Sequence, residues 1–150
     1  MAVRVDRGVG ATGEAQPGST LPGAGGVNAR DVGAHRTSIK SSIAAVTQQL
    51  TDILGAQLVA YLGSVRETRA VREWIAGTRV PRGDASQRLR FAYRVAKGIA
   101  DSDGIETAQA WFQGLNPMLG NVSPAQLIRN GDLVTEGPRI IEAEEQFLAA

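Results

Sequence analysis

From Ala56 to Gly77 the chain reads AQLVAYLGSVRETRAVREWIAG, and the organisation of the rest is best understood from this segment. Its apolar spacing predicts a short helix over 56–62, a turn at Gly63-Ser64 and a second helix over 67–76. Gly77 can adopt the left-handed conformation that commonly ends a helix. The segment therefore predicts a helix-turn-helix.

The second helix of this motif has two chemically different sides. Apolar Val71, Trp74 and Ile75 are expected to face the interior, and arginine and glutamate occupy the opposite side. Arginine pairs bidentately with guanine, glutamate accepts a hydrogen bond from cytosine, and residues near the start of the second helix usually meet the bases. The predicted base contacts are Arg66, Glu67 and Arg69, with Arg72 reaching a base or a phosphate.

Charge along the chain supports a polyanionic partner for the middle of the sequence. The whole chain has a net charge of +1, but residues 66–97 hold nine basic and three acidic residues, a net charge of +6. Residues 98–150 hold two basic and eight acidic residues, a net charge of −6. Phosphate contacts are predicted for Thr68, which could instead cap its helix, and for Arg79, Arg82 and Arg88. An ordinary three-helix packing motif with a solvated cationic surface is the alternative interpretation.

The remaining sequence predicts an all-α fold without internal repeats. Residues 1–36 contain eight of the 18 glycines and are expected to be disordered. Residues 37–100 are assigned to the helix-turn-helix region and residues 101–150 to a helical region for toxin binding or dimerisation. Further helices are predicted over 37–54, 85–100, 105–113, 124–130 (after a Ser123 cap) and from Pro138 to the C-terminus. Glu142, Glu144 and Glu145 are expected to be solvated.

Composition argues against catalysis and against several kinds of site. The chain has no cysteine and one histidine, which excludes disulfides, thiolate metal sites and multi-histidine metal sites within it. No histidine is placed to activate Ser123, so we expect no enzyme activity, no cofactor and no bound metal. No apolar run approaches the roughly 18 residues of a membrane span, and no secretory signal is recognisable, so a cytoplasmic protein is expected.

Two groups of residues resemble a known family. Leu62-Gly63, Val71, Trp74, Gly77 and Pro81 resemble the Xre-type repressor arrangement. The later segments WFQGLNPMLG (111–120) and SPAQLIRNGD (123–132) resemble the toxin-binding domain of the Xre/MbcA/ParS antitoxins, in which an aromatic helix, an Asn-Pro loop and a proline-started helix follow one another. The resemblance covers roughly residues 45–135, in the family's order.

The resemblance implies an antitoxin of a type II toxin–antitoxin system. Such proteins bind a RES-type toxin, which attacks NAD, cover its active site and repress their own operon as DNA-bound oligomers. The toxin-binding positions that it implies are Trp111, Asn116, Pro117 and Arg129. An acidic C-terminal region would suit a basic toxin surface. The amphipathic last helix could insert into a groove, with Ile141, Phe147 and Leu148 as anchors, or these three could close the core or a dimer interface.

Two other functions are compatible with the same residues. The first is a stand-alone helix-turn-helix transcriptional regulator whose C-terminal half only oligomerises or binds another partner. The second is a protein adaptor that no longer binds DNA. If the motif does bind its own promoter, a homodimer is expected, because such motifs usually read two half-sites.

Overall fold

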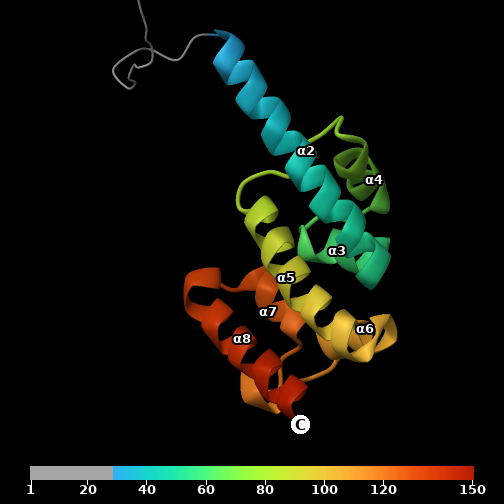
Figure 1. Cartoon of the computed structure of the whole chain (residues 1–150). Coiled ribbons are helices and arrows are strands. Elements are labelled where there is room, and N and C mark those ends of the chain that lie inside the picture. The colour runs from blue at the N-terminus through green and yellow to red at the C-terminus, as the bar shows by residue number, and fades with distance from the viewer. Residues whose placement is uncertain (1–28) are drawn as a thin grey trace, which may run out of the picture. The chain divides into compact units, whose positions relative to one another are not determined.

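The computed structural model describes the backbone of residues 29–150 and the side chains of residues 42–150. This part of the chain is helical, and apart from an isolated bridge between Asn116 and Val122 it contains no β-structure. The predicted all-α class is therefore confirmed for the described residues. The elements (Figure 1) are α2 (Ala29–Leu54), α3 (Ala56–Leu62), α4 (Thr68–Ala76), α5 (Ala85–Asp103), α6 (Ile105–Gln113), the 3-10 helix η2 (Pro117–Leu119), α7 (Pro124–Asn130) and α8 (Leu133–Ala149).

Two helices begin earlier than the sequence pattern predicts. Helix α2 starts at Ala29, so residues 29–36 of the predicted disordered arm are helical, and the rest of that arm lies outside the described residues. Adding residues to the N-terminal end of an existing helix requires no new nucleation. Residues 29–36 can therefore be helical although their apolar periodicity is weak.

The last helix, α8, begins at Leu133 and not at Pro138. Asp132 caps it, because its carboxylate accepts hydrogen bonds from the Val134 amide at 3.3 Å and from the Thr135 hydroxyl at 3.1 Å. Pro138 lies inside the helix, where it lacks the amide N–H that would donate to the carbonyl of Val134. Val134 is 85% exposed, so water can satisfy that carbonyl.

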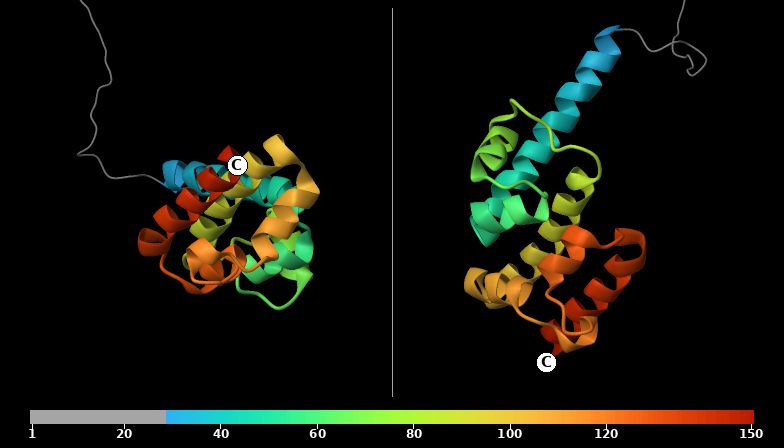
Figure 2. Two further views of the ribbon diagram at one scale, coloured as in Figure 1. Left: turned by 90° about the horizontal axis from the view of Figure 1, so that it is seen from below. Right: turned by 180° about the vertical axis from the view of Figure 1, so that it is seen from behind.

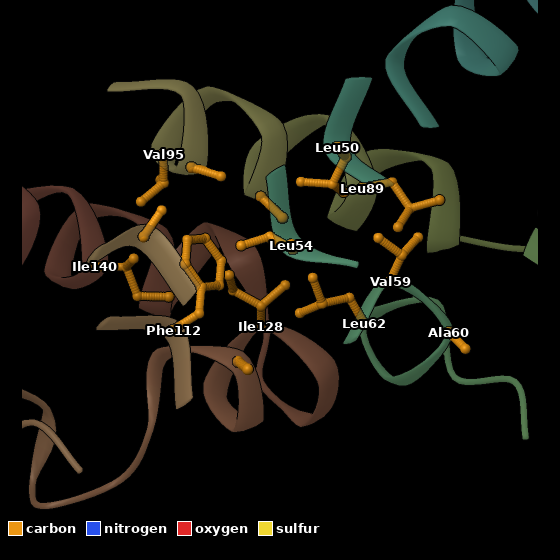
Figure 3. Packing of buried hydrophobic residues seen from close by; sticks show 14 of the residues in the cluster. Leu50, Leu54, Val59, Ala60, Leu62, Leu89, Val95, Phe112, Ile128 and Ile140 are labelled. Atoms are coloured by element: carbon orange, nitrogen blue, oxygen red, sulfur yellow. The ribbon is translucent and has the colours of Figure 1, made fainter. Parts of the chain in front are cut away.

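One hydrophobic core joins α3 and α4 to the C-terminal helices. Figure 3 shows Leu62 of α3, Ile128 of α7 and Phe112 of α6 following one another across it. Residues Thr37–Ala150 form one compact unit, and α5 continues across the predicted boundary between residues 100 and 101. Figure 2 shows α5 passing between α3–α4 and α6–α8. The two predicted regions are thus halves of one packed body.

The turn between α3 and α4 depends on a close contact rather than on an unusual glycine conformation. Gly63 has φ −84°, which any residue can adopt, and Ser64 takes the left-handed φ of 61°. A Cβ on Gly63 would lie 2.6 Å from Cη2 of Trp74. Trp74 is 2% exposed, as expected for a core residue. Glycine is therefore required because the indole ring occupies the space of a side chain.

Candidate functional site

The outer side of α4 presents the predicted base-contacting residues. Arg66, Arg69 and Arg72 are exposed, whereas Ala70, Val71 and Trp74 on the inner side are buried. Gly77 ends the helix with φ 78°, as predicted. The apolar side thus fixes the orientation of α4, with Arg69 and Arg72 on its solvent side and Arg66 exposed immediately before its N-cap.

The start of α4 is formed by Glu67 and Thr68. Glu67 is the N-cap residue, with φ −122° and ψ 145°, and its side chain makes no capping bond, so its carboxylate stays exposed. The hydroxyl of Thr68 accepts a hydrogen bond from Nη1 of Arg72 at 3.1 Å. Thr68 therefore positions Arg72 one turn further along the helix.

A glutamate that received no role from the sequence organises the arginines. Oε2 of Glu73 lies 3.3 Å from Nε of Arg69, and Oε1 lies 3.1 Å from Nη1 of Arg79. The hydrogen bond from Arg79, together with the nearby charge of Arg69, lowers the pKa of Glu73 below its ordinary value. The four-residue spacing from Arg69 was the signal that could have revealed this pair. Arg66, Glu67, Arg69, Glu73 and Arg79 share one hollow of about 450 Å³.

Arg88 is wrongly predicted as a phosphate contact. Its side chain is buried, and its Nε donates to the carbonyl oxygen of Leu62 at 3.0 Å. Its Nη2 lies 3.4 Å from the Ser64 hydroxyl, and its Nη1 pairs with Asp84. Position 88 on α5 faces the turn of the motif, so this arginine holds the turn in place. The predicted contacts Arg79 and Arg82 are exposed on the connection between α4 and α5.

Arg129 contacts Tyr61 of α3, although the resemblance implies a toxin contact. Its Nη1 donates to the carbonyl oxygen of Tyr61 at 2.9 Å, and its guanidinium carbon lies 4.5 Å from the centre of the Tyr61 ring. It lines a hollow of about 420 Å³ together with Arg66, Thr68, Gln57 and Tyr61. A residue of α7 thus joins the arginine-rich side of the molecule.

A second surface, here called the apolar groove, lies between α6, η2 and α8. It encloses about 400 Å³, and its lining includes Trp111, Leu115, Asn116, Pro117, Met118 and Phe147. The Trp111 ring lies 6.3 Å from that of Phe147, and Oδ1 of Asn116 accepts from the Met118 amide at 2.9 Å. Leu115 is 72% and Met118 41% exposed. Three of the positions implied by the resemblance therefore meet one of the predicted anchors.

The other two predicted anchors do not line the apolar groove. Ile141 is half-buried and lines a different hollow, together with Phe91 and Leu133. Leu148 is exposed near the C-terminus of α8. The alternative that the three anchors close the core therefore holds in part for Ile141, because this side chain packs against the hydrophobic core.

One of the three glutamates expected to be solvated is buried. Glu144 is 9% exposed, and its carboxylate occupies the space that a Cβ on Gly98 of α5 would take. Burial raises the pKa of Glu144, and the positive charge of Arg94 partly opposes this. Glu142 and Glu145 are exposed, as predicted. Position 144 lies four residues after Ile140 and three before Phe147, so helical spacing alone places it on the apolar side of α8.

Within the described residues, three or more histidine, cysteine, aspartate or glutamate side chains never gather as they would around a metal ion. In the same part of the chain, every helix is too short or too polar to cross a membrane. Comparisons with protein-family models, with curated proteins and with solved structures found no match. The chemistry of the two surfaces therefore has to support any assignment of function.

Proposed function

We propose that this protein is an antitoxin-type repressor that binds duplex DNA with α3 and α4 and binds a partner toxin at the apolar groove. The observation that carries the DNA part is the placement of Arg69 and Arg72 on the solvent side of a helix whose other side is buried, with Arg66 exposed just before its N-cap. A helix held in this way can enter a major groove while its arginines remain free to reach base edges.

On DNA, the two ends of the arginine surface have different roles. Arg66, Glu67 and Arg69 lie at the start of α4, where base contacts are made in such motifs. Glu73 restrains Arg69, and a restrained guanidinium loses less conformational freedom on binding a base. Arg79 and Arg82 follow the helix and bind the phosphate backbone, which favours every sequence equally. A homodimer places two copies of α4 on two half-sites.

The apolar groove supports the antitoxin part of the proposal. It brings together Trp111, Asn116 and Pro117, the positions at which the chain resembles toxin-binding domains, and it leaves Leu115 and Met118 exposed. Exposed apolar side chains around a hollow of this kind are typical of protein interaction sites. The acidic residues of α8 complement a basic surface on the toxin, which belongs to the NAD-degrading RES class under this proposal.

The DNA part is tested by measuring binding of the full chain to the duplex upstream of its own reading frame. Arg69→Ala is expected to cost about 1–3 kcal/mol on the preferred sequence and to relax the sequence preference. Arg82→Ala is expected to weaken binding to all sequences alike. Arg139→Ala removes an exposed cation on α8 and serves as the control. Absence of salt-sensitive binding by the wild type would contradict the proposal.

The antitoxin part is tested by co-expression with a RES-type protein encoded beside this chain. Wild-type chain is expected to relieve the growth arrest that this protein causes. Leu115→Glu with Met118→Glu is expected to abolish rescue while DNA binding persists, because both side chains are exposed and take no part in the core.

A stand-alone regulator is the second candidate function. The hollow lined by Phe91, Leu133 and Ile141 favours it, because these half-buried apolar residues would suit contact with another copy of the chain. If the wild type binds its promoter and relieves no growth arrest, this second function replaces the antitoxin.

A further inference from the structure

We infer that Arg129, from the C-terminal half of the chain, binds a backbone phosphate of the DNA together with Arg66, so that α7 is part of the DNA interface. This inference rests on the proposed DNA-binding function and adds a residue that neither the motif nor the resemblance assigns to DNA. It also removes Arg129 from the positions expected to contact a toxin.

The guanidinium of Arg129 is held in place and still has donors to offer. One N–H of Nη1 is used by the carbonyl oxygen of Tyr61, at 2.9 Å, and the Tyr61 ring covers one side at 4.5 Å. A guanidinium carries five N–H donors in a fixed plane, so the remaining donors are available to a bidentate acceptor. An arginine fixed in this way binds a phosphate with little further loss of side-chain entropy.

The hollow beside Arg129 has the composition of an anion site. Its lining consists of Gln57, Ala60, Tyr61, Val65, Arg66, Thr68 and Arg129. Two of these residues are cationic, three others offer polar hydrogen-bonding groups, and the lining includes no carboxylate. The hollow on the other side of Arg66 differs, because Glu67 and Glu73 line it and compete for the cations there. An incoming phosphate is therefore bound more strongly beside Arg129.

The position of this hollow points to duplex DNA as the source of the phosphate. Gln57 lies at the start of α3, and Thr68 lies at the start of α4. In a docked helix-turn-helix the first helix crosses the DNA backbone while the start of the second enters the major groove. The hollow that both helix starts line therefore faces the DNA backbone at the edge of the major groove. Arg129 reaches it because α7 packs against α3 through the common core.

The test compares two variants that remove the same charge from different places. The variant Arg129→Gln is compared with Arg139→Gln, which removes an exposed cation from α8. The probe is a set of duplexes selected by the wild-type full chain from a random-sequence pool, and binding is measured over a range of salt concentrations. Arg129→Gln is expected to lower the slope of log affinity against log salt by about 0.9, the value of one phosphate contact. Affinity should fall about tenfold on preferred and altered sequences alike.

The same series includes Arg129→Lys, which keeps the charge and should retain the wild-type salt slope. Arg139→Gln should match the wild type in slope and affinity. Thermal unfolding of each variant, with and without inorganic phosphate at constant ionic strength, separates binding from folding.

Each other result rejects a defined part of the inference. If Arg129→Gln keeps the wild-type slope and inorganic phosphate does not stabilise the wild type, the inference is wrong, whether or not the melting temperature falls, and Arg129 only joins α7 to α3. If inorganic phosphate stabilises the wild type but not Arg129→Gln, and the DNA slope is unchanged, the hollow binds free phosphate instead. If the wild type shows no salt-sensitive DNA binding, the proposed function itself fails, and this inference fails with it.

Discussion

The arginine surface of α4 and the apolar groove differ in how they can attract a partner. On α4 the exposed groups are cations, and Glu73 partly neutralises two of the arginines around it. In the groove the exposed groups are apolar side chains such as Leu115 and Met118. Charge attracts over about 10 Å and weakens with salt, whereas apolar burial acts at contact and is largely insensitive to salt. The two surfaces are therefore suited to two chemically different partners.

The surfaces also differ in how the fold supports them. The arginine surface rests on a tightly packed turn, where Trp74 lies on Gly63 and the buried Arg88 binds the turn carbonyl of Leu62. The groove rests on a short 3-10 helix, in which the amide of Met118 donates to the Asn116 side chain. A change in the turn should therefore disturb the DNA surface more than the groove.

The largest effect is expected from Gly63→Ala. Its new methyl group would lie 2.6 Å from the Trp74 ring, so we expect a loss of about 2–3 kcal/mol in the free energy of unfolding, measured by urea denaturation. Gly77→Ala is the control, because its Cβ would meet nothing within 4 Å and the change tests only the left-handed φ of 78°. That control should cost about 1 kcal/mol.

A double variant checks the cause of this loss. Combining Gly63→Ala with Trp74→Phe removes the ring atoms that the methyl group meets, so the two changes should cost less together than the sum of their separate effects. Strictly additive losses would mean that Gly63 acts through the backbone and not through contact with the indole.

An intermediate effect, on affinity, is expected from Glu73→Gln. The change releases Arg69 and Arg79 from their shared carboxylate and raises the local charge by one. Binding to arbitrary duplexes should tighten by about threefold to tenfold, and the preference for the selected sequence should fall. Partner binding at the groove should not change. An unchanged preference would show that Glu73 does not restrain the base-contacting arginine.

The smallest effect is expected from Glu144→Gln, and it depends on pH. Burial raises the pKa of this carboxyl from its ordinary value of 4.5, so the folded protein holds its proton to higher pH than the unfolded chain does. Stability from this group is therefore present at low pH and is lost as pH rises through the folded pKa. The variant should melt about 1–3 °C above the wild type at pH 7 and at nearly the same temperature below pH 4.5.

Glu142→Gln provides the matched control for this comparison, because the charge of Glu145 itself contributes to the raised pKa of Glu144. Glu142 is an exposed residue on the same helix, and its replacement should leave the melting temperature unchanged at both pH values. A lower melting temperature for Glu144→Gln at pH 7 would mean that attraction to Arg94 outweighs the cost of burial.

Features that depend on neighbouring residues alone could be read from the amino-acid order. The helices over 56–62, 105–113 and 124–130 have the predicted bounds. The amide of Gln126 donates to the Ser123 hydroxyl at 3.1 Å, as the Ser-Pro cap predicts. Spacing along α4 also separated its buried side from its arginine side. Periodicity, capping and turn chemistry act over a few residues, so they are legible without knowledge of the fold.

The roles of individual charged residues required knowledge of which helices pack together. Arg88 and Arg90 are two residues apart and so lie on nearly opposite sides of α5: Arg88 is buried against the turn, and Arg90 is exposed, where it donates to the Ser42 hydroxyl at 3.1 Å. Arg129 reaches the carbonyl of Tyr61 from 68 residues away. A charge is buried or solvated according to its neighbours in space, and those neighbours are set by the packing of the shared core.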